Sequence, residues 1–126
     1  MSMENAPVIC AVENGVVIAT VLVPQIRDSQ VVDILRSTML QAIDSSDARS
    51  VIVSLRDVKF MMSMSFLAFM AVRRRMGEGR VILCDINPEI AEILSLCRLI
   101  PTEKMPSAPF EVASSLSEAR ERCGLV

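Results

Sequence analysis

The stretch VIVSL at residues 51–55 decides the fold class of this chain. Its residues are mostly β-branched and apolar with little polar alternation, which is typical of a strand buried on both faces of a parallel sheet. Residues 81–86 form a second stretch of this kind, and the apolar residues of 66–76 predict a helix between them that ends at Gly77 or Gly79. Strand, helix and strand in this order predict two parallel strands joined by a right-handed crossover.

The chain before this stretch begins with a predicted antiparallel hairpin. Residues 8–12 and 16–23 are rich in β-branched side chains, and Asn14-Gly15 lies between them. Asn-Gly is a strong hairpin signal because both positions tolerate a positive φ. Pro24 ends the second strand, since proline cannot donate a hydrogen bond within a sheet.

A helix is predicted between the hairpin and the central strand. Asp28 or Ser29 can cap its start by accepting a hydrogen bond from the first free N–H groups. The polar cluster of residues 44–47 ends it. The apolar residues recur at helical spacing between these ends, and they are Val32, Leu35, Met39 and Ile43.

The rest of the chain adds a helix, a short strand and a last helix. Asn87-Pro88 predicts a helix start, residues 110–112 a strand, and Ser115 or Ser117 a cap for the last helix. The complete order predicts an α/β fold. It has a mixed, mostly parallel sheet of about five strands with an N-terminal antiparallel hairpin, and about four helices. No linker divides the chain, so we expect one domain over residues 1–126.

Composition narrows the classes of function. Hydrophobic residues make up 52% of the 126 residues, which predicts a well-filled core. The net charge of −2 and the absence of Tyr and Trp argue against a nucleic-acid-binding surface. The longest uncharged apolar runs, at residues 14–26 and 60–72, fall short of the about 20 residues that cross a bilayer. With no secretion signal at the start, we expect a cytoplasmic protein that does not bind membranes.

Histidine and cysteine usage disfavours an enzyme or a metalloprotein. The chain has no histidine, which removes the commonest general base and the commonest metal ligand. None of the four cysteines forms a CxxC motif, and Cys10, Cys84 and Cys97 lie in apolar patterns that predict buried free thiols. We therefore expect no enzymatic activity, no metal and no cofactor.

Element order and spacing over residues 8–120 resemble the STAS domain, which is shared by anti-sigma factor antagonists and the cytoplasmic tails of sulfate transporters. The segments that carry the resemblance are residues 51–60, 63–76, 79–84, 87–99 and 110–119. The resemblance implies the STAS fold and, in the antagonist branch, regulation through a protein partner.

The resemblance also points to a motif at the start of the second helix. In antagonists this motif is Asp-Ser-Ser/Thr-Gly, and a partner kinase that is also the anti-sigma factor phosphorylates its second hydroxyl residue. In this chain Met62 stands at the Asp, Ser63 matches the first hydroxyl, Met64 stands at the acceptor and Ser65 replaces the Gly. Methionine cannot accept phosphate, so a phosphorylation switch requires Ser63 or Ser65.

Each of these residues also has a structural interpretation. Ser63 or Ser65 can simply cap the helix. Methionines can form an adaptable binding surface or fill the core. We expect Met62 and Met64 to be exposed because they flank Ser63 at a helix start. We expect the core to hold Met61, Met70 and Met76.

Two further groups of polar residues favour structural roles. Arg73-Arg74-Arg75, with Arg80 nearby, could bind an acidic partner or a phosphate, but such a run is more typical of a solvated helix end. The loop at residues 24–28 and the turn at 85–88 follow predicted strands and could border a ligand. A Gly-rich phosphate loop is missing there, so caps and turns are the better interpretation.

The sequence therefore predicts a regulatory protein-binding module that resembles an anti-sigma factor antagonist. It would dock a partner, an anti-sigma factor or a serine-kinase-like protein, through the start of the second helix. The predicted contact residues are Met62, Met64, Phe66, Arg27 and Asp28. The alternative is an unphosphorylated structural or scaffold subunit that assembles with itself, as a homo-oligomer, or with related domains.

Overall fold

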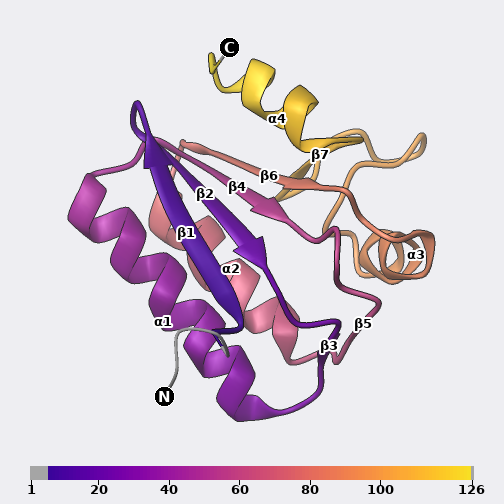
Figure 1. Ribbon diagram of the computed structural model, residues 1–126. Helices are drawn as coiled ribbons and strands as arrows, with labels where there is room; N and C mark the ends of the chain where they lie inside the picture. Colours follow the sequence, from indigo (N-terminus) through magenta and orange to yellow (C-terminus); the bar gives the residue numbers. More distant parts are fainter. Residues whose placement is uncertain (1–5, 126) are drawn as a thin grey trace.

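The computed structural model describes residues 6–125, which form a five-stranded sheet with helices on both faces (Figure 1). Four helices and a further pair of two-residue strands complete the fold. The elements are β1 Val8–Glu13, β2 Val16–Val21, β3 Gln25–Ile26, α1 Ser29–Ser46, β4 Ser50–Ser54, β5 Phe60–Met61, α2 Ser65–Met76, β6 Arg80–Cys84, α3 Pro88–Leu96, β7 Glu111–Ala113 and α4 Leu116–Arg122.

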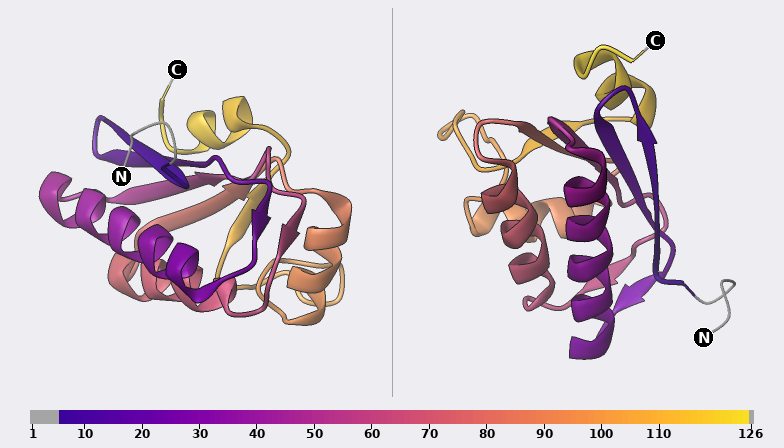
Figure 2. Two further views of the ribbon diagram at one scale, coloured as in Figure 1. Left: turned by 60° about the horizontal axis from the view of Figure 1, so that its bottom comes forward. Right: turned by 90° about the vertical axis from the view of Figure 1, so that its left-hand side faces the viewer.

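The sheet has the strand order β1-β2-β4-β6-β7. β1 and β2 are antiparallel, and every other neighbouring pair is parallel. α1 and α2 lie side by side on one face of the sheet and α4 lies on the opposite face (Figures 1 and 2). The predicted mixed α/β sheet with a leading hairpin and four helices is confirmed.

Burial on both faces explains why the central strands are so apolar. Val51, Val53 and Leu83 point toward α1 and α2, whereas Ile52 and Ile82 point toward α4. All five side chains are almost fully buried. The weak polar alternation of residues 51–55 and 81–86 is thus the result of two covered faces.

Local signals predicted from the sequence form as expected. Asn14 and Gly15 turn the hairpin with φ of 46° and 78°. The Asp28 side chain accepts a hydrogen bond of 2.8 Å from the Val31 N–H at the start of α1, and Asp47 ends this helix with a φ of 52°. Asn87 caps α3 and Ser115 caps α4 in the same manner as Asp28.

Some predicted details are wrong. We expected Cys97 to be buried, but it is exposed at the end of α3 because Ile90 and Leu94 form the buried stripe of that helix. Phe60 lies only two residues after Val58, which is 1% exposed, yet Phe60 itself is 42% exposed. The sequence did not predict the pairing of β5 with β3, which turns Met61 inward and leaves Phe60 outside.

Candidate functional site

The small β3–β5 sheet places the loop after β2 beside the start of α2. The Lys59 N–H donates to the Pro24 carbonyl at 2.8 Å, and the Met62 N–H donates to the Ile26 carbonyl at 2.9 Å. Gln25 and Ile26 pair with Phe60 and Met61. Segments more than thirty positions apart in the chain therefore form one surface.

The start of α2 is closed by backbone hydrogen bonds instead of a side-chain cap. The N–H groups of Ser65, Phe66 and Leu67 donate to the carbonyl groups three residues before them, at 2.9, 3.1 and 3.1 Å. Met64 stands at the cap position in a helical conformation, and its side chain accepts no hydrogen bond. The prediction that Ser63 or Ser65 caps this helix is therefore wrong, since the tight turn already satisfies the N–H groups.

The two candidate phosphorylation residues lie in opposite environments. Ser63 is exposed at the turn that opens α2. Ser65 is 0% exposed, and its hydroxyl has no hydrogen-bond partner. A kinase could reach the Ser65 hydroxyl only if the first turn of α2 opened, whereas Ser63 is accessible in the folded chain.

The apolar side chains around this turn differ in how far they are exposed. Met62 and Phe66 are half-buried and pack against the core. Met64 is 42% exposed and Leu67 is 61% exposed. The exposure expected for Met64 is present, whereas Met62 is partly covered because its backbone is held against Ile26.

Arg27 and Asp28 border the same turn but have different local partners. The Arg27 guanidinium carbon lies 4.6 Å from the centroid of the Phe60 ring, a cation–π arrangement. The Asp28 carboxylate already accepts the capping hydrogen bond of α1. Both side chains are exposed, but Arg27 lies against the exposed Phe60 ring, whereas the Asp28 carboxylate is engaged in capping α1.

We use the term α2 surface for the exposed residues around this turn. They are Arg27, Phe60, Ser63, Met64 and Leu67. Sequence reasoning missed Phe60 and Leu67. The spacing of residues 64 and 67 could have indicated Leu67, because positions three apart share one face of a helix.

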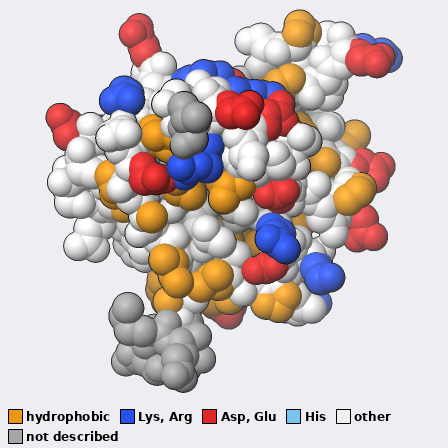
Figure 3. Space-filling model, turned by 45° about the horizontal axis from the view of Figure 1, so that its top comes forward, with side chains coloured by type: hydrophobic (Ala, Val, Ile, Leu, Met, Phe, Trp, Pro, Cys, Tyr) orange, Lys and Arg blue, Asp and Glu red, His pale blue; other side chains and the backbone are white. Residues whose placement is uncertain are grey.

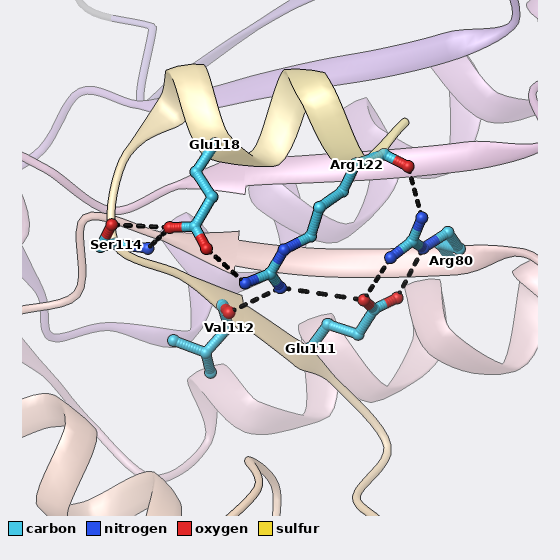
Figure 4. A network of polar contacts seen from close by, with 6 residues as sticks. All are labelled: Arg80, Glu111, Val112, Ser114, Glu118 and Arg122. Atoms are coloured by element: carbon cyan, nitrogen blue, oxygen red, sulfur yellow. Dashed lines mark hydrogen bonds and ion pairs between the residues drawn. The ribbon is translucent and has the colours of Figure 1, made fainter. Parts of the chain in front are cut away.

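Three of the four arginines in the predicted basic group have partners within the chain, whereas Arg74 is exposed at the solvated end of α2. Arg73 donates to the Gly79 carbonyl at 2.7 Å, and Arg75 pairs with Asp44 at 2.6 Å. Arg80 forms two hydrogen bonds with the Glu111 carboxylate, at 2.8 and 2.6 Å, which lower the pKa of Glu111 (Figure 4). These contacts support the interpretation of the basic run as a solvated helix end, and not as a binding site for an acidic partner or a phosphate.

The Arg80–Glu111 pair belongs to a network that anchors α4. Arg122 on α4 donates to Glu118 at 2.5 Å and to the Val112 carbonyl at 2.8 Å (Figure 4). Hydrogen bonds from the Ser114 hydroxyl and backbone, followed by the Arg122 pair, lower the pKa of Glu118 to about 2. Acidic and basic side chains lie next to one another over this face (Figure 3), so it offers no single-sign patch.

A concave region separate from the α2 surface lies at the carboxyl ends of β2, β4 and β6. It is a half-open hollow of about 400 Å³. Its lining residues are Thr20, Ser54, Arg56, Asp57, Asp85 and Leu116. The predicted loop residue Asp85 lies here, whereas Arg27 and Asp28 do not line it. Burial, and secondarily Asp85, raises the pKa of the neighbouring Cys84 thiol to about 12, so this cysteine stays protonated.

Residues 6–125 contain neither a cluster suited to a metal ion nor a helix suited to crossing a membrane. Within that range, no group of three or more acidic, cysteine or histidine side chains could hold a metal ion. None of the helices that the structure describes combines the length and the apolar character that crossing a membrane requires.

Comparison with known structures finds the same fold in anti-sigma factor antagonists. The unphosphorylated anti-sigma factor antagonist SpoIIAA is 17% identical with a TM-score of 0.68, over 94% of this chain and 99% of that one. The phosphorylated Bacillus cell fate determinant SpoIIAA is 19% identical with a TM-score of 0.69, over 92% and 98%. An anti-sigma-factor antagonist (STAS) domain protein from Planctomyces limnophilus is 21% identical with a TM-score of 0.75, over 91% and 95%.

Sequence comparison agrees with the structural likeness. No curated protein matches the chain, but the family model of the STAS domain matches residues 23–119. This match spans the small sheet, the start of α2 and most of the parallel core. The chain therefore belongs to the STAS domain family.

Proposed function

We propose that the chain is a cytoplasmic, non-enzymatic regulatory module that docks a protein partner through the α2 surface. Membership of the STAS family and likeness to SpoIIAA support a regulatory role. The observation that carries the docking proposal is the exposure of Phe60, Met64 and Leu67 around one helix start.

The composition of the α2 surface suits a protein interface. Aromatic, methionine and arginine side chains are enriched where proteins meet, and this surface combines Phe60, Met64 and Arg27. Methionine adapts its shape to a partner because its chain is unbranched. The partner we propose is an anti-sigma factor or a serine-kinase-like protein, which is the partner class that the resemblance implies.

A phosphate on Ser63 would switch this surface off. Ser63 is exposed beside the start of α2, where the positive end of the helix dipole tolerates an anion. The phosphate would add up to about two negative charges beside exposed apolar side chains, and a partner that covers them would have to desolvate that charge. Ser63 is the candidate of the two serines because the Ser65 hydroxyl is buried.

A second candidate function is a scaffold subunit that is never phosphorylated. The residue at the expected phosphorylation position and the serine that follows it favour this function. Met64 carries no hydroxyl, and the hydroxyl of Ser65 is inaccessible. In this function the α2 surface binds constitutively.

Docking is tested with a photo-crosslinking residue at position 64 in the native host. A residue of the same kind at Leu96, which is 76% exposed on α3, is the matched control. We expect a partner to be captured from position 64 only. The purified partner should bind the wild-type chain, and Leu67→Asp should weaken that binding at least about tenfold, because it places a charge in a desolvated interface. Equal capture from both positions, or binding that Leu67→Asp leaves unchanged, would refute docking through the α2 surface.

Phosphosite mapping of the protein from the same cells separates the two functions. Phosphate on Ser63, together with loss of partner binding in the phosphorylated fraction, would support the switch. An unmodified peptide in both growth and stress would support the scaffold.

A further inference from the structure

β1 is an edge strand whose outer backbone groups face away from the sheet. Pro7 lies opposite Leu22, and the Leu22 N–H donates to the Pro7 carbonyl at 2.8 Å. In an antiparallel pair, hydrogen-bonded residues alternate with residues whose backbone groups point outward. Val8, Cys10 and Val12 are therefore the outward set, and no other strand of residues 6–125 pairs with them.

The residues of β1 themselves carry none of the usual features that protect an edge strand against pairing. Exposed edge strands are commonly blunted by lysine, by proline within the strand or by a bulge. The register from Val8 to Glu13 is unbroken, and its first five residues are uncharged. Ile9 is 54% exposed and Val12 is 48% exposed. The only charge, on Glu13, is paired with Arg120 of α4.

The flank of α1 next to this edge is also uncharged. Asp44 pairs with Arg75 and so marks the side of α1 that faces α2. At 100° per residue, Asp33 and Arg36 fall on that same half of the helix. The opposite flank carries Val31, Ile34, Thr38, Ala42 and Ser45. β1 and α1 lie side by side at this edge, where no further strand of residues 6–125 pairs with β1 (Figure 2, right), and together they form a neutral strip.

We propose that two copies of the chain associate antiparallel through β1, with the two-fold axis at Cys10. In this register each outward residue meets an outward residue, since Val8 lies opposite Val12 of the second copy and Cys10 opposite Cys10. Each of these pairs exchanges two backbone hydrogen bonds. The exposed Ile9 lies opposite Ala11 of the second copy, so apolar surface is covered on the α4 side as well.

A second copy fits this strip better than a charged partner. The strip offers no charge to attract an acidic or basic surface, and its outward ladder is symmetric about Cys10, so a two-fold partner matches it residue for residue. Like charges never face each other in this register, because residues 7–12 carry none. The dimer does not depend on the proposed docking function, since it leaves the start of α2 uncovered.

Sedimentation equilibrium of the full chain tests the dimer. We expect a species of twice the 13.8 kDa chain mass. Ala11→Lys puts two like charges near the axis and should raise the dimer Kd about tenfold or more. Ala11 is exposed in the single chain, so its far-UV circular dichroism should not change. Leu96→Lys introduces the same charge on α3 and should leave the Kd unchanged.

Oxidative cross-linking tests the register. A hydrogen-bonded antiparallel pair holds its Cα atoms about 5.5 Å apart, within reach of a disulfide. In a Cys97→Ser background, mild oxidation should give a covalent dimer linked through Cys10, and Cys10→Ser should abolish it. A wild-type monomer at all concentrations, a Kd insensitive to Ala11→Lys, or a dimer that never links through Cys10 would each overturn the proposal.

Discussion

Replacing Ser65 with alanine should stabilise this protein, although Ser65 is fully buried. Truncating a buried residue usually destabilises a protein because contacts are lost. Here the hydroxyl is 0% exposed and has no hydrogen-bond partner. Its removal eliminates an unsatisfied polar atom and leaves the rest of the side chain in place.

The size of the effect follows from two contributions. A buried polar group without a partner costs about 1–3 kcal/mol, and alanine is the better helix former by up to about 0.5 kcal/mol. We therefore expect Ser65→Ala to raise the free energy of unfolding by about 1–3 kcal/mol. A domain of this length has an unfolding entropy near 0.26 kcal/mol/K, so Tm should rise by about 4–12 °C.

Far-UV circular dichroism is the appropriate readout, because the chain has no Trp and no Tyr for fluorescence. Urea and thermal unfolding should both show the increase. Ser63→Ala is the matched control, and since Ser63 is exposed its effect should stay within about 0.5 kcal/mol. A loss of stability in Ser65→Ala would show that the hydroxyl has a partner, for example a buried water, and would refute the reasoning.

Three further predictions concern the core, a close backbone contact and pH. Phe69→Ala should lower the free energy of unfolding by about 3–5 kcal/mol, because Phe69 of α2 is 2% exposed in the main hydrophobic core. Gly79→Ala should cost about 1–3 kcal/mol or more, because a Cβ there would lie 2.4 Å from the Arg49 carbonyl oxygen. Glu118→Gln should flatten the fall of Tm at acid pH: the pKa of Glu118 is lowered to about 2 in the folded state, so its stabilisation is present above about pH 4.5 and is lost as pH falls toward 2.

Matched variants distinguish these effects from general sensitivity. Leu67→Ala removes an exposed apolar side chain of α2 and should change stability by less than about 0.5 kcal/mol. Glu78→Ala changes the residue next to Gly79 but does not bring a Cβ against the Arg49 carbonyl oxygen. Glu121→Gln removes an exposed carboxylate of α4 and should keep the wild-type pH profile. A Gly79→Ala variant as stable as Glu78→Ala, or parallel pH profiles for Glu118→Gln and the wild type, would contradict these assignments.

The candidate site could be predicted in part. The sequence placed Ser63 and Met64 at the start of the second helix, and both are exposed there. It could not predict that Ser65 is buried or that Phe60 is exposed. These outcomes depend on the pairing of β5 with β3, where two residues on each side leave no periodicity to detect.

The sequence by itself determined what depends on neighbours in the chain. The Asn14-Gly15 turn and the caps at Asp28 and Asn87 need only a few adjacent residues, and each formed as predicted. The burial of residues 51–55 on both faces was also predicted, because apolar composition reports burial directly.

Only the tertiary structure decided how distant segments meet. The Met62 N–H reaches the Ile26 carbonyl, and Arg27 lies over Phe60, although more than thirty residues separate the members of each pair. A backbone turn replaced the expected serine cap at α2 because those same contacts set the path of the chain into the helix. Such contacts arise from packing between elements, and no local pattern of residues encodes them.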